Sequence, residues 1–472
     1  MKMKHKFTKL RINVDKRFVS IIVLVLIFAA IFISSIVFRA YFFGNNSLPG
    51  KEANFNINIA KDILSFKNDF VLQKLAVREL VWPLTIALVS FITRLSPELS
   101  MIILSFLFGV FSVVLIYLII EKMDFKKRNL ALAFFLISPV TIWLFSTFNR
   151  FILPFFFALL ALYFLLLEKK NLSLLALAFT SLFGIVSSVS ALTILILGFK
   201  KGFWKWFWKA ILISFFINIL LFFLFPFLGV FKFNFNNLFS LFFSLSEFGI
   251  SIFTFLLACI GIFITWKGRK ERKELFLVYI TFTLLFIFSI TNKAFIFFFN
   301  FILVLLAAIG FIKLLERDWA SQFIKKLTIG ILVIGIILPL VFMPLRIASL
   351  TPNTNLVNAL EFLKGEEDGK VLSIKDNGYW IKGFSGKEAF VDDFKAQVKP
   401  ELEEKALEFL NERNLKKMNE EFKSKNIKYF LLDKQTRKLF RTEDEGILLL
   451  LHTSAFNKIY DKEGIEIWEF LE

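Results

Sequence analysis

Long apolar runs separated by short polar segments dominate the first three quarters of the chain. The first run, 18–38, is about as long as the 20 residues that a helix needs to cross a bilayer. Ten further runs follow, at 101–120, 130–146, 153–167, 172–185, 188–198, 211–230, 251–266, 275–290, 295–314 and 327–341. The pattern predicts a helical membrane bundle of about eleven spans. A shorter run, 81–95, is expected to lie at the outer interface.

The charge of the loops gives the expected orientation. The segments that would face the cytoplasm are dense in Lys and Arg, namely 1–17, 121–129, 168–171, 200–209, 267–274 and 315–326. Because basic loops favour the cytoplasmic side, we expect a cytoplasmic N-terminus and an extracytoplasmic C-terminal part. This alternation requires two short spans on either side of Gly184 rather than one. The run 18–38 is too long for a signal-peptide core, so it is expected to be retained.

The composition of the chain changes near residue 350. Periodicity there predicts a helix at 356–363, a strand at 370–374, helices at 400–411 and 415–424, and a strand at 427–432. Two further strands, 456–460 and 465–470, flank 461–464 as a hairpin. The expected organisation is a membrane domain, 1–348, with a long outer loop at 44–100. A small extracytoplasmic α/β domain, 349–472, follows it.

Composition and charge narrow the class of protein. Hydrophobic residues make up 57% of the chain, which is typical of an integral membrane protein. The net charge of +19 lies in short clusters between apolar runs, so it argues for membrane topology and against a nucleic-acid partner. The single cysteine, Cys259, excludes an internal disulfide, and the two histidines, His5 and His452, are far apart in sequence. Any metal would therefore be Mg or Mn held by carboxylates rather than zinc.

Acidic residues are few in the segments that are expected at the outer face. Glu52 follows the first run, Glu247 precedes the run 251–266, and Asp376 follows the strand predicted at 370–374. Three carboxylates that converged on one outer cavity could hold a metal or act as a general base.

These segments resemble motifs of the GT-C membrane glycosyltransferases, and more narrowly the catalytic subunit of oligosaccharyltransferase and its archaeal relatives. Asp376–Ile381 is similar to the family's WWDYGYWI run without the two leading tryptophans. Glu52–Asn56 looks like the acidic first-loop motif with Glu in place of Asp, and Ser244–Glu247 looks like its SVSE-type motif. The loop Ser146–Pro154 departs from the family, because it has no acidic residue where a second acidic motif is expected.

The resemblance implies a polyprenyl-phosphate-linked glycan donor, membrane lipid around it, and a protein or lipid acceptor at the outer face. It implies catalytic roles for Glu52 and Glu247, with Glu52 also holding Mg or Mn. Lys293 and Arg150 would face the negative charge of the diphosphate. Asp376 would accept a hydrogen bond from an acceptor hydroxyl. The implied substrate-binding residues are Asp376, Tyr379, Trp380, Arg150, Lys293 and Asn56.

Other interpretations remain open at this stage. A simpler GT-C transferase with one base and no metal would fit the loop Ser146–Pro154, and so would a non-catalytic relative that binds lipid-linked glycan or acts as an assembly partner. A transporter is disfavoured because paired charges inside spans are lacking. The candidate residues also have ordinary structural explanations: a solvated loop acid, a helix N-terminal acid, a turn aspartate, and basic side chains that reach the interface.

Overall fold

The computed structural model divides the chain into two compact units. The first unit comprises Met1–Phe38, Ala76–Trp82 and Leu99–Ala348, and the second comprises Arg39–Leu75, Pro83–Glu98 and Ser349–Glu472. The structure describes residues 2–44, 46–65, 77–123, 128–198, 203–224, 241–242, 249–267, 273–442 and 444–471. Most of the first long loop therefore belongs with the C-terminal part of the chain in one unit.

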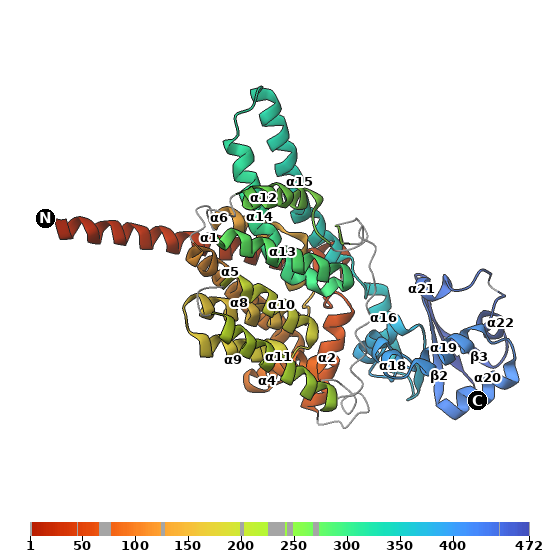
Figure 1. The fold of residues 1–472 in the computed structure, drawn as a ribbon. Coiled ribbons are helices and arrows are strands. Elements are labelled where there is room, and N and C mark those ends of the chain that lie inside the picture. Colours follow the sequence, from red (N-terminus) through yellow and green to blue (C-terminus); the bar gives the residue numbers. More distant parts are fainter. Residues whose placement is uncertain are drawn as a thin grey trace. The chain divides into compact units, whose positions relative to one another are not determined.

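Helices occupy the apolar runs of the first unit. They are α1 (Lys2–Phe43), α5 (Pro97–Lys122), α6 (Arg128–Ile137), α7 (Pro139–Ser146), α8 (Ile152–Leu166), α9 (Lys170–Ser181), α10 (Ile185–Leu195), α11 (Phe203–Leu224), α12 (Ile252–Lys267), α13 (Lys273–Thr291), α14 (Ile296–Glu316) and α15 (Gln322–Ala348) (Figure 1). Short 3-10 turns, η1 (Ile196–Gly198) and η3 (Lys293–Phe295), flank α10 and α14. Each of the predicted apolar runs contains a helix. The separation expected near Gly184 is present, since that glycine, with φ 92°, ends the turn between α9 and α10.

The run 130–146 differs from the expected single helix. It is broken into α6 and α7, which are bent by 61°. Pro139 is the first residue of α7, where its missing N–H is tolerated, and it disfavours helical geometry at Ser138 before it. The hydroxyl of Ser138 donates to Oδ1 of Asn300 at 2.7 Å, and Nδ2 of Asn300 donates to the hydroxyl of Thr141 at 2.9 Å. These bonds satisfy buried polar groups at the break.

Several helices have the length and composition of membrane spans. Within the described residues five helices are long and apolar enough to cross a bilayer, or six if α6 and α7 form one bent span. Five shorter apolar helices accompany them, at Leu80–Thr93, Ile152–Leu166, Ile185–Gly198, Ile252–Trp266 and Phe276–Thr291. The total of eleven spans and the orientation of the termini stay predictions.

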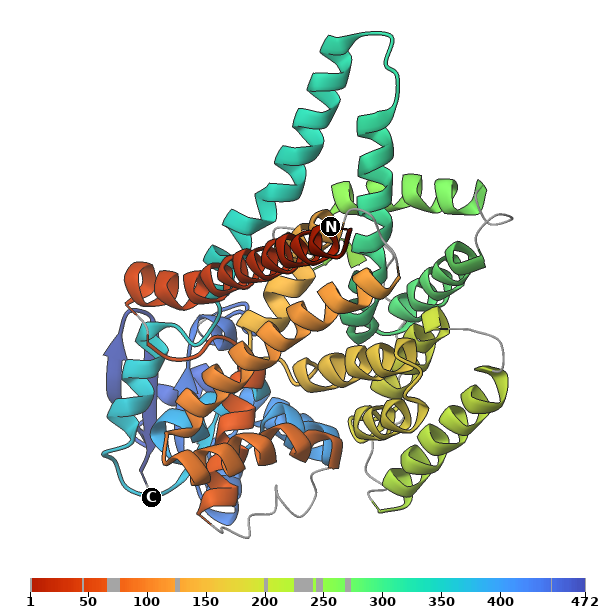
Figure 2. The same cartoon turned by 90° about the vertical axis from the view of Figure 1, so that its left-hand side faces the viewer.

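Helix α14 forms the centre of the first unit and is buried along most of its length. It packs closely on α12, and glycines make this approach possible. A Cβ on Gly261 would overlap the carbonyl oxygen of Leu306, and a Cβ on Gly310 would overlap that of Leu257. Small residues let membrane helices approach in this way. Figure 2 shows α14 and α15 as the two arms of a helical hairpin.

The second unit begins with α2 (Lys51–Leu64), and α4 (Val77–Thr93) coincides with the run predicted at the interface. Its C-terminal part adds α16 (Thr354–Leu363), α18 (Asp393–Val398), α19 (Pro400–Asn411), α20 (Leu415–Lys425), α21 (Lys434–Arg437) and α22 (Ile447–Leu451). The four strands are β1 (Lys370–Leu372), β2 (Ile427–Leu432), β3 (Phe456–Lys462) and β4 (Ile465–Phe470). The predicted membrane helices and small α/β C-terminal domain are confirmed.

The sheet has the order β1-β2-β4-β3, with β1 parallel to β2 and the other neighbours antiparallel. Side chains alternate across β2, so this strand contributes to a core on each face. Tyr429 and Leu431 pack with α16 on one face, whereas Phe430 and Leu432 pack with α19, α20 and α22 on the other. Both faces of the sheet are thus covered, which explains why β2 is almost wholly buried.

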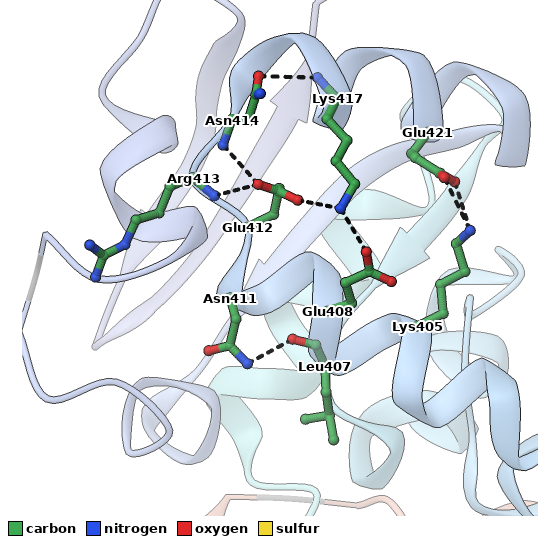
Figure 3. Close-up of polar contacts among 9 residues, drawn as sticks. All are labelled: Lys405, Leu407, Glu408, Asn411, Glu412, Arg413, Asn414, Lys417 and Glu421. Atoms are coloured by element: carbon green, nitrogen blue, oxygen red, sulfur yellow. Dashed lines mark hydrogen bonds and ion pairs between the residues drawn. The ribbon is translucent and has the colours of Figure 1, made fainter.

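Charged side chains join α19 to α20 at the surface (Figure 3). The ammonium of Lys417 lies 2.7 Å from a carboxylate oxygen of Glu408 and 2.8 Å from one of Glu412. These partners, Glu408 first, raise the pKa of Lys417 above its ordinary value. The side-chain oxygen of Asn414 accepts from the backbone N–H groups of Lys416 and Lys417, which caps α20. The two helices predicted here are confirmed.

Candidate functional site

The start of α2 is fixed by backbone contacts within the second unit. Gly50 precedes the helix with φ 87°, a conformation that side chains disfavour, and its N–H donates to the carbonyl of Thr351 at 3.0 Å. Lys51 and Glu52 then form the first turn. An acidic residue in that turn interacts favourably with the helix dipole, which favours Glu52 at this position.

A buried guanidinium holds the same region together. Arg39, which is 2% exposed, donates to the carbonyl oxygens of Ser47 at 2.7 Å, Leu350 at 2.5 Å and Pro352 at 2.5 Å. The planar guanidinium of arginine presents five N–H donors in a fixed geometry, so it can reach several carbonyl oxygens at once. The residues before α2 are thus tied to those that begin the C-terminal part.

The Asp376 run forms three consecutive helical turns after β1. They are η4 (Lys375–Asn377), α17 (Gly378–Trp380) and the π-helical η5 (Ile381–Ser385). Strand β1 ends two residues earlier than the strand predicted at 370–374. A short extended piece follows the run at 388–390, where the N–H of Phe390 donates to the carbonyl of Val371 and the N–H of Val371 donates to the carbonyl of Glu388, both at 2.9 Å.

Gly378 allows the run to pack against the next segment of chain. A Cβ at this position would overlap the carbonyl oxygen of Val391 and the backbone of Asp392. Asp392 in turn caps α18, because its carboxylate accepts from the N–H of Lys395 at 2.7 Å. The glycine of the run therefore brings Asp376 and Asp393 to the same place.

One face of α2 contacts the Asp376 run. The contacting residues have the spacing i, i+4, i+7 and i+11, which lies along one side of a helix: they are Lys51, Phe55, Asn58 and Asp62. The ring centres of Phe55 and Tyr379 are 5.0 Å apart, and Nδ2 of Asn58 donates to the Tyr379 carbonyl at 2.8 Å. At the far end, Nζ of Lys382 lies 2.6 Å from a carboxylate oxygen of Asp62.

Lys51 lies between two carboxylates at the near end of this face. Its ammonium contacts Oδ1 of Asp376 and lies 3.3 Å from Oδ2 of Asp393. The side chains of Lys51 and Asp376 are 36% and 39% exposed, so a ligand could still approach the aspartate. A carboxylate has about four lone-pair sites, and one ammonium contact does not saturate it.

Two buried polar atoms in the run make no hydrogen bond to the part of the chain that the structure describes. They are Oδ1 of Asn377 and Nε1 of Trp380. The amide of Asn377 donates to the hydroxyl of Ser373 at 3.0 Å, and that hydroxyl donates to the carbonyl of Leu431 at 3.1 Å. Trp380 packs in the core beside Tyr429. Trp380 is therefore a buried core residue on the β2 side of the run. Its expected role in substrate binding stays a prediction.

The structure brings some of the expected site residues into one unit. Glu52, Asn56, Asp376, Tyr379 and Trp380 all belong to the second unit. Asn56 is buried, and its Nδ2 donates to the carbonyl of Glu52 at 2.7 Å. Its amide hydrogen therefore supports the first turn of α2.

The remaining expected residues lie elsewhere. Arg150 follows α7 in the first unit, with its guanidinium carbon 5.5 Å from the ring centre of Phe151. Lys293 begins η3 in that unit, after Asn292, whose side chain accepts from the N–H of Ala294 at 2.9 Å. Glu247 lies outside the described residues, so its expected role stays a prediction.

A Mg or Mn ion at Glu52 would need further oxygen ligands close to that carboxylate. These ions take oxygen ligands, usually from two or more carboxylates together with water or phosphate. Among the residues described, no three His, Cys, Asp or Glu side chains come together as a metal-binding group. Asp376 and Asp393 do come together, but an ammonium contacts both. The described side chains thus form no group of three such ligands, and a metal at Glu52 stays a prediction.

Sequence reasoning missed the residues that hold α2 to the run. Lys51, Asn58, Asp62, Lys382 and Asp393 were not among the expected site residues. The regular spacing of polar residues along α2 was an available signal, since it places Lys51, Asn58 and Asp62 on one side. No feature of the sequence alone indicated which residues these side chains contact, because their partners lie more than three hundred residues away.

No family model matches the sequence, and no curated protein matches it significantly. Several solved structures share the fold. The archaeal oligosaccharyltransferase AglB from Archaeoglobus fulgidus, solved with an inhibitory peptide and a dolichol-phosphate, superposes with a TM-score of 0.66 at 12% identity, covering 95% of this chain and 73% of that one. ArnT from Cupriavidus metallidurans, solved with undecaprenyl phosphate, gives 0.57 at 12% identity, covering 95% and 97%.

The arabinofuranosyltransferase AftD from Mycobacteria gives a TM-score of 0.54 at 11% identity, covering 94% of this chain and 40% of that one. All three proteins are GT-C glycosyltransferases. At identities this low, the superpositions establish only that the architecture is shared. This shared architecture agrees with the resemblance of the sequence motifs. The chain has the fold of the GT-C membrane glycosyltransferases.

Proposed function

We propose that this protein transfers a sugar or oligosaccharide from a polyprenyl-phosphate-linked donor to a protein or lipid acceptor at the outer face of the membrane. The observation that carries the proposal is the packing of α2, which bears Glu52, against the Asp376 run. Two segments that resemble separate motifs of one family thus meet in one unit of a GT-C fold. Oligosaccharyltransferase-like transfer is the form of the reaction that these motifs favour.

The donor class is supported by the ligands of the structural neighbours. AglB was solved with a dolichol-phosphate and ArnT with undecaprenyl phosphate, both of which are polyprenyl phosphates. Apolar helices long enough to cross a bilayer provide surroundings in which such a lipid tail is soluble. Cleavage of the sugar–phosphate bond leaves negative charge on the lipid phosphate. Arg150 and Lys293 are the cations that we assign to that charge.

Two carboxylates are available for the acceptor. We assign Glu52 as the general base that takes the proton from the acceptor nucleophile as its bond to the sugar carbon forms. Asp376 would accept a hydrogen bond from an acceptor hydroxyl, using lone pairs that Lys51 does not occupy. Electrons from the nucleophile enter the new glycosidic bond, and those of the broken bond leave with the lipid phosphate.

The test compares glycan transfer by wild-type chain and by Glu52→Gln in membranes supplied with polyprenyl-linked oligosaccharide. The substitution keeps the shape of the side chain and removes its basicity, so transfer should fall about a hundredfold or more, as for loss of a general base. Glu404→Gln on the exposed face of α19 is the matched control and should transfer normally. Equal transfer by the Glu52 variant would contradict the assigned base.

A second candidate function has a specific observation in its favour. The ammonium of Lys51 contacts Asp376, and the loop Ser146–Pro154 has no acidic residue, so the chain could be a non-catalytic relative that binds lipid-linked glycan. In that case the wild-type chain would retain labelled polyprenyl-linked glycan in a pull-down without transferring it. Any change in the glycan profile of cells that lack the protein would then arise from the partner proteins that it assists.

A further inference from the structure

We propose that Lys51 is a positioning residue whose ammonium bridges the carboxylates of Asp376 and Asp393 and thereby orients Glu52, its neighbour on α2. The inference rests on the proposed function and deepens it, because it concerns how the acceptor-side carboxylate is held. It assigns a role to a residue that neither the motif resemblance nor the metal hypothesis includes.

The first step is the geometry of the pair of aspartates. Gly378 brings the chain at Asp376 against the backbone at 391–392, and Asp393 follows directly. Two carboxylates held near each other repel, and each would favour protonation unless a cation lies close by. The ammonium of Lys51 contacts both, one through Oδ1 and the other through Oδ2. It therefore occupies the position of a bridging cation.

The second step concerns the other lysines near this point. Lys375 is next to Asp376 in the chain, but its ammonium is directed to Glu403 at 2.5 Å. Lys395 is close to Asp393 in the chain, but its ammonium binds Glu388 at 2.7 Å. Each of these ammonium groups thus makes its close contact with another carboxylate, while the charge of Lys375 acts on Asp376 and Asp393 from further away. Lys51 is the lysine whose ammonium bridges the two aspartates.

The third step links Lys51 to the proposed base. Consecutive residues of an α-helix point about 100° apart, so Lys51 and Glu52 cannot face the same neighbour. The contacts of Lys51 with the two aspartates fix the rotation of α2 about its axis at the N-terminal end of the helix. The ion pair of Asp62 with Lys382 fixes it at the C-terminal end. The direction of Glu52 is then fixed relative to the Asp376 run. A flexible lysine can supply this charge without the strict octahedral ligand set that Mg requires.

The experiment measures transfer and thermal unfolding of the full chain in detergent with lipid, before and after addition of Mn²⁺. The wild-type chain should unfold at the same temperature with or without Mn²⁺, because Lys51 already bridges the two carboxylates. Lys51→Met should lose at least about tenfold in transfer, as expected when a charge-assisted contact that positions a reacting group is removed. Mn²⁺ should recover part of that loss and raise the unfolding temperature of the variant, because two carboxylates then lack their cation.

Two further variants separate positioning from simple loss of stability. Lys51→Arg should keep transfer without Mn²⁺, since a guanidinium can bridge the same carboxylates. Lys405→Met removes a lysine that pairs with Glu421 on α19 and α20, and it should show no response to Mn²⁺. A merely structural role for Lys51 would give the same loss in the presence and absence of Mn²⁺.

The outcomes distinguish the two proposals. A Lys51→Met variant that neither loses activity nor gains a response to Mn²⁺ would overturn the role of Lys51. If the wild-type chain transfers no glycan at all, the proposed function fails. The unfolding measurements would still decide whether Lys51 bridges Asp376 and Asp393.

Discussion

Asp62 on α2 and Lys382 in η5 form an ion pair, 2.6 Å from Oδ2 to Nζ, in which only 9% of the aspartate side chain is exposed. Asp62→Asn would leave the lysine facing a neutral amide in a partly buried place. We expect the free energy of unfolding to fall by about 2 kcal/mol. Breaking a fully buried ion pair typically costs about 3–5 kcal/mol, and the expected loss is smaller here because Lys382 remains partly exposed. The denaturant midpoint of the detergent-solubilised chain measures the change.

Lys61 provides the comparison for this pair. It lies beside Asp62 on α2 and pairs with Glu98 at 2.7 Å, but its side chain is largely exposed. Exposed pairs contribute little, so Lys61→Met should lower the free energy of unfolding by less than about 1 kcal/mol.

A double-mutant cycle of Asp62→Asn and Lys382→Met measures the coupling energy between these two side chains. Additive effects of the two substitutions would show that the Asp62–Lys382 ion pair does not hold α2 to the run.

Gly378→Ala should disturb the Asp376 run from within. The added Cβ would overlap the backbone of 391–392, which cannot move away as a side chain could. We expect a loss of roughly 1–3 kcal/mol in the free energy of unfolding, the usual cost of overpacking. Transfer should also fall, because Asp376 and Asp393 would move apart. Both are measured on the same purified variant.

Gly365 is the matched glycine for that comparison. A Cβ there would lie 3.6 Å from the carbonyl oxygen of Phe362, which is an ordinary contact. Gly365→Ala should therefore leave both stability and transfer near the wild-type values. Equal behaviour of the two alanine variants would mean that the approach of Gly378 to Val391 is not required.

Gly261→Leu should separate α12 from α14 in the first unit. The carbonyl of Leu306 lies where the new side chain would begin, so the helices could pack only at a greater distance. We expect a lower unfolding temperature and a poorer yield of folded protein from membranes. Gly330→Leu on α15 is the control, because a Cβ there meets no atom within 4 Å. A similar loss for both variants would contradict the role of close packing at Gly261, because the change from glycine to leucine by itself favours a helix.

The elements of the C-terminal part were predictable because their signals are local. Pro400 begins a helix, Asn411 ends it, and the turn before Ile465 defines the β3–β4 hairpin, so propensity and turn chemistry agree with the final structure. The break between α6 and α7 was missed although Pro139 was visible inside the run. Apolar composition alone was given more weight there than the geometry that proline imposes on the residue before it.

The candidate site was predictable only in part, for a physical reason. The motif resemblance identified Glu52 and Asp376 as residues of one site, and the structure joins their segments through Lys51. A contact between residues 51 and 376 depends on the folding of everything between them, and no local periodicity encodes it. The position of Trp380 likewise depends on residues far away in the sequence, since it packs in the core that Tyr429 and Leu431 form on the sheet.

Tyr429 should make the stability of the second unit sensitive to alkaline pH. Its hydroxyl donates to the carbonyl of Glu367 at 2.8 Å, and burial raises the pKa of Tyr429 from 10.0 to about 12. The unfolded chain therefore loses the phenolic proton at lower pH than the folded chain does. Unfolding then releases a proton, so the free energy of unfolding is at its full value below pH 10 and falls as the pH rises from 10 to about 12.

Tyr429→Phe isolates this effect. The variant loses one hydrogen bond, which should cost about 1 kcal/mol at neutral pH. Above pH 10 the free energy of unfolding of the variant should decline less steeply than that of the wild-type chain. The two proteins differ only in the phenolic proton of Tyr429, which the folded wild-type chain holds more tightly than the unfolded chain does. Denaturant titrations of both proteins at intervals from pH 8 to about 11.5 measure the difference. Parallel curves across that range would show that the phenol of Tyr429 titrates alike in the folded and unfolded states, and that the hydrogen bond to Glu367 does not hold its proton.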